Sequence, residues 1–204
     1  MISPEFLITA LIVVLVPGTG VIFTVSTALA RGTRAAIIAA IGCTLGILPH
    51  IAAAILGITA ILNLSAIVFR VVRFIGVAYL LYMAYSMWKN TETLKIETRS
   101  SSERGLKIIS RAVLLNLLNP KLTLFFMAFL PQFLSFGSTS RIESMVALSG
   151  LFMFMTLVVF IAYGVASSAA RQALTKSPRL VRWIQRTFAG LLALFALRLA
   201  LADE

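Results

Sequence analysis

The chain has 204 residues, of which 60% are apolar and 12% are charged, and its mean hydropathy is +1.00. Soluble domains contain about 45–50% apolar and about 25% charged residues, and a core of this size cannot hide the excess, so the composition excludes a soluble enzyme domain and a disordered tail. The formal net charge of +11 does not indicate nucleic-acid binding, because the cations lie in short gaps between apolar runs.

Six apolar runs are candidates for membrane-spanning helices, each of which needs about 20 residues. In chain order they are residues 6–30, 35–69, 70–88, 111–141, 144–170 and 187–202. The first run is too long, and the residues before it too poor in cations, for a cleaved signal peptide, so we expect a retained helix. The sequence therefore predicts an all-α integral membrane protein with six transmembrane helices.

The positive charges predict the orientation of these helices. Two, six and five Lys or Arg residues lie in the gaps after the first, third and fifth runs, so 13 of the 18 fall on one side. The positive-inside rule places that side in the cytoplasm. Both termini are therefore expected on the outer side of the membrane.

A polar, basic linker over residues 89–111 divides the chain into a first repeat, residues 1–88, and a second repeat, residues 112–204. Each part holds three of the predicted helices. If the parts are related, the odd number of crossings turns the second upside down relative to the first, which is the inverted-repeat architecture of many secondary transporters. Pro17 and Pro120, each followed six residues later by a phenylalanine, give this repeat weak support.

Each part of the predicted repeat has a proline inside its first helix. Pro17, Gly18 and Thr19 interrupt the first run, and Asn119 and Pro120 interrupt the fourth. Proline removes a backbone donor and clashes with the carbonyl group four residues earlier, and in lipid the freed polar groups need another partner or a wet cavity. We therefore expect helices 1 and 4 to be broken at these prolines and to enclose a substrate-binding site near the middle of the membrane; two ordinary kinks are the alternative.

Lys121 follows the second of these prolines and is the charge that we expect at the site. A cation inside a span is costly to insert and normally faces the interior or water, and none of the seven Asp and Glu residues lies within a run. We therefore predict that Lys121 meets the carboxylate of a substrate, with Asn116 and Asn119 on the same helix face as polar contacts. The alternative is that Lys121 lies near one surface and extends to the headgroups.

Histidine is the side chain best suited to exchange protons at physiological pH, which makes His50 a candidate for proton coupling; a hydrogen-bonded residue between helices is the competing interpretation. Gly42 and Gly46 share a helix face with His50 and permit close approach of another helix, within the chain or in a homo-oligomer. Tyr79 in the third run and Tyr163 in the fifth are further candidates for hydrogen bonds to a substrate.

The sequence lacks the residue sets that several other functions require. One His and one Cys, without a carboxylate inside any run, do not make a metal site. Nucleophile-and-base arrangements for catalysis are not visible, and neither is a phosphate-binding GxxxxGK[ST] motif. We therefore expect no enzyme, no metal and no cofactor.

These residues resemble the LysE/RhtB family of bacterial amino-acid exporters over nearly the whole chain. The resemblance rests on the order and spacing of short segments, which are Val16-Pro17-Gly18, residues 30–35, residues 42–46 with His50, residues 76–82, residues 116–121 and residues 129–133. The chain departs from the family at Thr19, where a second proline is usual, and at Met83-Ala84, where a glycine is common.

The resemblance implies a multi-pass protein of the bacterial cytoplasmic (inner) membrane, with both termini on the periplasmic side, that exports amino acids or close derivatives. We predict a secondary active exporter, driven by the proton-motive force, that works by alternating access. Its expected partners are a small-molecule substrate and the lipid bilayer. The alternatives are efflux of another small solute or cation, or a membrane subunit without transport of its own.

Overall fold

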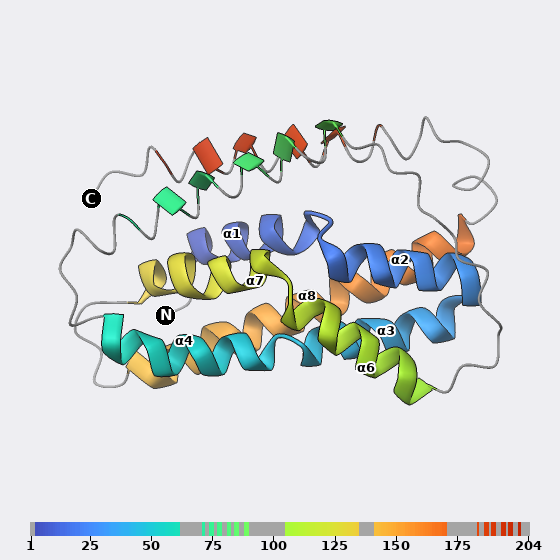
Figure 1. The fold of residues 1–204 in the computed structure, drawn as a ribbon, viewed down its shortest axis with the longest axis horizontal. Helices are drawn as coiled ribbons and strands as arrows, with labels where there is room; N and C mark the ends of the chain where they lie inside the picture. Colours follow the sequence, from blue (N-terminus) through green and yellow to red (C-terminus); the bar gives the residue numbers. More distant parts are fainter. Residues whose placement is uncertain are drawn as a thin grey trace.

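The computed structural model describes residues 3–61, 105–134 and 141–170, together with scattered helical residues within 71–89 and 183–200. In the three continuous stretches every regular element is helical, as the composition predicts (Figure 1). These elements are α1 (Pro4–Leu15), α2 (Thr19–Arg31), α3 (Thr33–Leu45), α4 (Leu48–Ile61), α6 (Gly105–Leu117), α7 (Pro120–Leu124), the π-helix η1 (Phe125–Phe129), the 3-10 helix η2 (Leu130–Phe133) and α8 (Arg141–Ala169).

The first apolar run forms two helices that meet at an angle. The Ser3 side chain caps α1 by accepting a hydrogen bond of 3.2 Å from the backbone N–H of Phe6. The helix ends at Leu15, and α2 begins at Thr19 with its axis bent by 51° from that of α1. Pro17 lies in the gap and has no N–H to donate to the carbonyl group of Val13, so the α-helical ladder stops at this point.

A tight turn at Gly32 reverses the chain between α2 and α3. Its φ of 83° lies in the left-handed region that favours glycine. The next helical segment, Thr33–Gly57, comprises α3 and most of α4 and is long and apolar enough to cross a membrane.

The face of α3 that carries Gly42 and Gly46 packs directly on α6. A Cβ atom added at Gly42 would lie 2.7 Å from the Cβ atom of Ala112, and one at Gly46 would lie 2.8 Å from the Cβ atom of Asn116. Only hydrogen fits at either position. The glycine pair therefore serves packing within the chain, which is one of the two uses that its spacing predicts.

The second bent pair begins at Gly105, earlier than the predicted start of the fourth run at Arg111. The segment Gly105–Leu117 is bent by 51° from the segment Pro120–Phe133. The second segment changes from α-helix to π-helix at Phe125 and then to 3-10 helix at Leu130. The π-helix was not predicted by the sequence pattern; such irregular turns occur frequently at functional sites.

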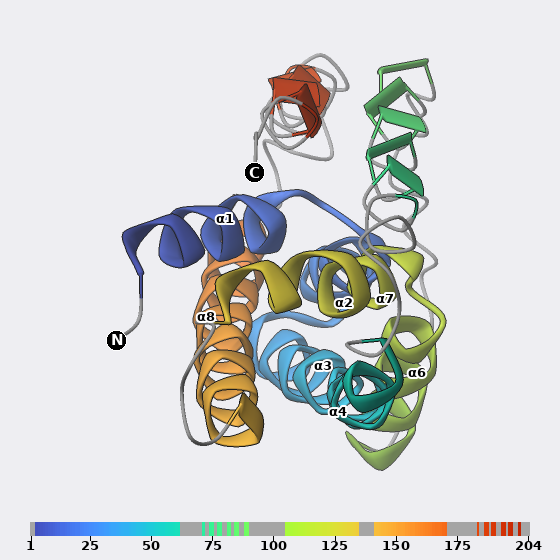
Figure 2. The same ribbon diagram turned by 90° about the vertical axis from the view of Figure 1, so that its left-hand side faces the viewer.

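The long helix α8 packs along both bent pairs. It contacts α1, α2, α3, α4 and η2, and Figure 2 shows α3 lying between α8 and α6 with α2 beside it. Phenylalanine rings fill the space where α8 meets the second bent pair: the centroids of Phe125 and Phe152 are 4.3 Å apart, and those of Phe126 and Phe152 are 5.4 Å apart.

The described helices account for up to four membrane spans. Two single helices, Thr33–Gly57 and Ile142–Ala169, meet the length and hydropathy of a span, and each bent pair meets them when its two segments are taken together. These correspond to the predicted first, second, fourth and fifth spans. The predicted third and sixth spans, and residues 89–104 of the predicted linker, lie outside the continuously described residues.

Candidate functional site

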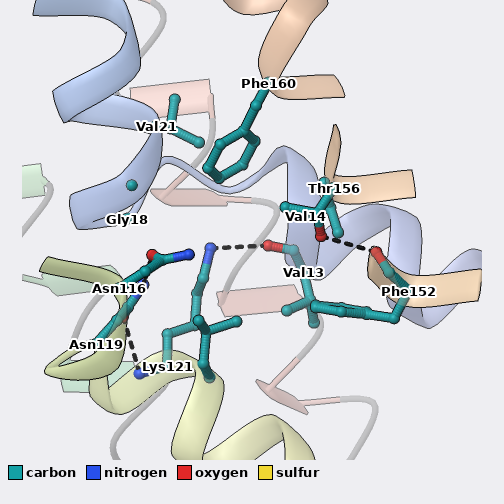
Figure 3. A pocket seen from close by; sticks show the side chains of 12 residues that line it. Val13, Val14, Gly18, Val21, Asn116, Asn119, Lys121, Phe152, Thr156 and Phe160 are labelled. Carbon is teal, nitrogen blue, oxygen red and sulfur yellow. Dashed lines mark hydrogen bonds between the residues drawn. The ribbon is translucent and has the colours of Figure 1, made fainter. Parts of the chain in front are cut away.

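A small cavity lies where the two bent pairs meet α8 (Figure 3). It holds about 260 Å³ of space between atoms, including the part open to the outside. The first break is residues 16–18, between α1 and α2, and the second break is residues 118–119, between α6 and α7. The polar lining of the cavity comes from residues at or beside these two breaks and from α8, and the rest of its lining is apolar. The lining residues are Val13, Val14, Gly18, Gly20, Val21, Asn116, Asn119, Lys121, Leu122, Phe152, Thr156 and Phe160.

Lys121 is buried in this lining, with 4% of its surface exposed. Its side chain extends from α7 to the end of α1 (Figure 3), where its Nζ atom donates hydrogen bonds of 3.0 Å to the carbonyl oxygen of Val13 and 2.8 Å to that of Val16. The partner of the buried cation is therefore the backbone of the first break. The alternative of a lysine that extends to the headgroups does not describe this geometry.

The sequence explains why these carbonyl groups are available. The last carbonyl groups of any α-helix lack partners within the helix, and Pro17 has no N–H that could reach the carbonyl group of Val13. The carbonyl group of Leu15 is bound by the Tyr163 hydroxyl of α8 at 2.8 Å. The first break is therefore held by two side chains from distant parts of the chain, which avoids the cost of unpaired backbone groups in lipid.

Asn119 organises the second break. It is the N-cap of α7, and its Oδ1 atom accepts a hydrogen bond of 3.1 Å from the backbone N–H of Lys121. Its Nδ2 atom donates to the Oδ1 atom of Asn116 at 3.3 Å, and the Nδ2 atom of Asn116 donates to the carbonyl oxygen of Cys43 at 2.6 Å. Both asparagines are buried, so these hydrogen bonds fix the base of Lys121 against α3.

His50 lies beside this network rather than in the cavity lining. Its Nε2 atom donates a hydrogen bond of 3.1 Å to the carbonyl oxygen of Asn116, and its Nδ1 atom accepts one of 3.3 Å from the hydroxyl of Thr123. The side chain thus connects α4 to both sides of the second break. This is the interhelical, hydrogen-bonded histidine that was the competing interpretation of the sequence.

The two breaks cap each other. Lys121, in the first turn of α7, binds the carbonyl groups at the end of α1, and Thr19, the first residue of α2, donates a hydrogen bond of 3.2 Å to the carbonyl oxygen of Leu115 near the end of α6. Carbonyl groups at the end of α1 therefore accept hydrogen bonds from a residue at the start of α7, and one near the end of α6 accepts from a residue at the start of α2.

Glycines allow the two breaks to approach this closely. A Cβ atom at Gly18 would lie 3.3 Å from both the Cε and the Nζ atoms of Lys121. A Cβ atom at Gly20 would lie 2.6 Å from the Oδ1 atom of Asn116 and 2.8 Å from a ring carbon of Phe160. A side chain at Gly20 would therefore displace the amide network, and one at Gly18 would press on the lysine.

Of the site residues predicted from the sequence, Gly18, Asn116, Asn119 and Lys121 line the cavity. Four others lie around it without lining it. Pro17 and Pro120 form the breaks, and Thr19 and Tyr163 bind the carbonyl groups at their ends. Tyr79 lies outside the described residues.

The α8 wall, formed by Phe152, Thr156 and Phe160, was missed by the sequence analysis. Thr156, Phe160 and Tyr163 are spaced by four and three residues, so they share a helix face. Extending the stripe backwards from Tyr163 would have identified this wall. The hydroxyl of Thr156 donates a hydrogen bond of 2.8 Å to the carbonyl oxygen of Phe152, so its proton is already used within α8.

The lining defines what the cavity can bind. It contains one lysine and two carboxamides, and no carboxylate or thiolate occurs among its lining residues in the described part of the chain. No group of three or more metal-ligating side chains is found among the residues that the structure describes. The arrangement therefore suits a small molecule with an anionic group and an apolar remainder.

The sequence model of the LysE type translocator family matches residues 11–203. A homoserine/homoserine lactone efflux protein of Salmonella typhimurium is 27% identical over 84% of this chain and 87% of its own length. A leucine efflux protein of an Enterobacter species is 28% identical over 76% of each chain.

Another relative, an uncharacterized membrane protein of Vibrio cholerae, is 36% identical over a segment that covers 63% of each chain. No solved structure matches the chain.

Proposed function

The chain belongs to the LysE type translocator family, and we propose that it is a secondary active exporter that carries amino acids or close derivatives out of the cytoplasm. Membership of this family identifies a multi-pass membrane transport protein. The relatives named for homoserine and leucine efflux support small amino acids as substrates.

The observation that carries the proposal is the buried lysine in the cavity between the two breaks. Lys121 has three N–H donors when protonated, and the hydrogen bonds to Val13 and Val16 use two of them. A substrate carboxylate in the cavity would accept a charge-assisted hydrogen bond from Lys121, which is stronger than a neutral one. Gly18, at the start of α2, adds the positive end of a helix dipole at the same place.

Alternating access is the transport mechanism that we propose. The two bent pairs run in opposite directions in Figure 1, as an inverted repeat requires, and both line the cavity. A water-sized molecule finds only about 10 Å³ of free space in the cavity, far less than the range of about 300–1,000 Å³ of typical ligand sites. We therefore assign the described arrangement to a closed conformation, from which movement of one pair against the other opens the site to either side.

The proposed orientation puts the basic helix ends in the cytoplasm. The end of α2, the start of α3 and the start of α6 lie together at one end of the molecule (Figure 1). This end carries the cations Arg31, Arg34, Lys107 and Arg111. The opposite end, where α1 and α8 begin, carries Glu5, Arg141 and Glu143. The positive-inside rule then places α1 and α8 with their first residues at the outer side.

We further propose that export is coupled to the proton-motive force and that His50 is the coupling residue. His50 is buried and hydrogen-bonded to both sides of the second break, so a change in its protonation would alter the contacts that hold this break. Export that continues unchanged after the proton gradient has been collapsed with an ionophore would contradict this coupling.

The test of the proposed function is metabolite profiling of the medium after overexpression in a bacterial host. Cells with the wild-type protein should accumulate one or more amino acids outside, relative to an empty vector. Cells with Lys121→Ala should resemble the empty vector, although the variant is present in the membrane. The matched control is Lys107→Ala at an exposed site on α6, which should export like the wild type. Unchanged export by Lys121→Ala would remove the lysine from the site.

A further inference from the structure

The end of α1 offers several backbone acceptors to the cavity region. Val13 and Val16 both direct their carbonyl oxygens at one nitrogen atom, and Leu15 directs its own at the Tyr163 hydroxyl. Carbonyl groups at the C-terminus of a helix carry the negative end of the helix dipole. Two such oxygens within 3.0 Å of the same nitrogen form an environment suited to a primary ammonium group.

The ammonium group that occupies this place belongs to a distant segment. Lys121 comes from α7, more than a hundred residues further along the chain, on a flexible four-carbon stem. Gly18 of the first break lies beside this nitrogen atom, since a Cβ atom added there would be 3.3 Å from Nζ. Glycine at this position has no side chain that could pack against the lysine and hold it in place. The lysine is therefore able to leave these carbonyl groups if another ammonium group satisfies them.

From this geometry we infer that the carbonyl oxygens of Val13 and Val16 form a binding site for a primary ammonium group, which Lys121 fills in the closed conformation. This inference rests on the proposed function. In the loaded transporter the ammonium group of the amino acid takes the place of Lys121 at the carbonyl oxygens, and Lys121 moves to the carboxylate of the same molecule. The ammonium group of the substrate thereby replaces that of Lys121 at the end of α1, and each of the two ammonium groups has a hydrogen-bonding partner.

The exchange defines a class of substrate. A free α-ammonium group is needed to replace Lys121 at the carbonyl oxygens of Val13 and Val16. A free carboxylate is needed to bind the displaced Lys121. Apart from the amides of Asn116 and Asn119 and the hydroxyl of Thr156, the remaining lining is apolar and supplies no acidic partner for a second cation. The site therefore selects zwitterionic amino acids with uncharged side chains and discriminates against lysine, arginine and N-acylated amino acids.

Chemical rescue tests the ammonium site without any transport measurement. Lys121→Ala removes three carbons and the nitrogen, which is the size of n-propylammonium. Added n-propylammonium should raise the unfolding midpoint of the purified variant saturably, by about 2 °C or more. Propan-1-ol, which lacks the charge, and tetramethylammonium, which has no N–H, should not raise it. The wild-type protein and Lys107→Ala should show no such rise, because Lys121 fills the site in both.

Equal stabilisation by n-propylammonium and propan-1-ol, or none by either, would overturn the ammonium site. If Lys121→Ala is not recovered folded, both compounds are supplied throughout purification, and recovery with the amine alone supports the site. Recovery with neither compound contradicts it. Because the readout is protein stability, a failed rescue leaves the proposed export function standing, and a failed export assay leaves the ammonium site standing.

A second measurement on the wild-type protein tests the exchange itself. In proteoliposomes, 4-methyl-2-hydroxypentanoate, which is leucine with a hydroxyl in place of the ammonium group, should inhibit labelled leucine flux at least about tenfold less strongly than leucine does. Lysine should also be the weaker inhibitor. Inhibition by the hydroxy acid as strong as that by leucine would overturn the exchange.

Discussion

The Nζ atom of Lys121 lies 2.8 Å from the carbonyl oxygen of Val16, and this contact joins the second bent helix pair to the end of the first half-helix. The same nitrogen binds Val13, so a buried cation and a helix C-terminus satisfy each other inside the bundle. Removing either partner leaves the other without its hydrogen bonds in a low-dielectric site, which costs more than the bonds contribute. The contact is therefore a coupling point between the two parts of the molecule.

Pro17→Ala should lower export while the protein stays folded. The new N–H at position 17 would compete with Lys121 for the carbonyl oxygen of Val13, and α1 could continue toward α2 without the 51° bend. A competing hydrogen bond of about 0.5–1.5 kcal/mol corresponds to a decrease in export of up to about tenfold. The measurement is the export rate per amount of protein in the membrane.

Pro4→Ala is the matched control for this substitution. Pro4 occupies the first turn of α1, where a missing N–H leaves no carbonyl group unpaired. Export should remain at the wild-type level. A decrease as large as that of Pro17→Ala would show that proline content, and not the break at the site, is what matters.

Gly20→Ala should destabilise the protein, because its Cβ atom would lie 2.6 Å from the Oδ1 atom of Asn116. Asn116 is buried and hydrogen-bonded and Phe160 is buried, so moving them aside is costly and we expect a loss of about 1–3 kcal/mol. Gly150→Ala on α8 is the control, since nothing lies within 4 Å of its Cβ position; alanine there should stabilise the helix by up to about 1 kcal/mol. The two unfolding midpoints in detergent should therefore shift in opposite directions, and shifts in the same direction would refute the close packing at Gly20.

Tyr163→Phe should weaken the first break, because it removes the hydrogen bond to the carbonyl oxygen of Leu15. Interhelical hydrogen bonds in membranes contribute about 0.6 kcal/mol on average and up to about 1.7 kcal/mol. We expect a loss of stability in this range together with slower export. Tyr85→Phe, at an exposed position, should leave both quantities unchanged. Identical behaviour of the two variants would argue against a role for Leu15 and Tyr163.

Labelling of introduced cysteines tests the orientation. Cys43 is buried and is the single cysteine of the chain, so Cys43→Ala gives a background for Lys107→Cys and Ile142→Cys at opposite ends of the molecule. A membrane-impermeant maleimide added to intact cells should label position 142, and position 107 should react only after the membrane has been opened. The reverse pattern would place the basic ends outside.

Part of this arrangement can be expected from residue type alone. Pro17 and Pro120 have physical consequences that do not depend on tertiary structure, because a missing donor interrupts a helix wherever it occurs. Lys121 was expected in the interior since a charge within an apolar run has few stable positions. Asn116 and Asn119 followed from their spacing on the same face.

The partners of these residues could not be predicted in the same way. The acceptors of Lys121 are backbone oxygens of Val13 and Val16. Every residue has a backbone carbonyl group, so the residue types do not indicate which of these groups will bind a side chain. The lysine therefore has partners although no acidic residue lies within an apolar run. Similarly, nothing in the composition of residues 125–129 distinguishes a π-helix from an α-helix, because tertiary packing decides between them.

The proposed mechanism depends above all on Lys121 binding the substrate amino acid in the cavity between the two breaks. The decisive experiment is efflux of labelled leucine or homoserine from proteoliposomes containing the purified protein, with Lys121→Met as a variant of similar length without the charge. We expect saturable efflux by the wild type and a rate at least about tenfold lower for the variant. Equal efflux rates for the two proteins, at equal amounts of folded protein, would refute this role of the lysine.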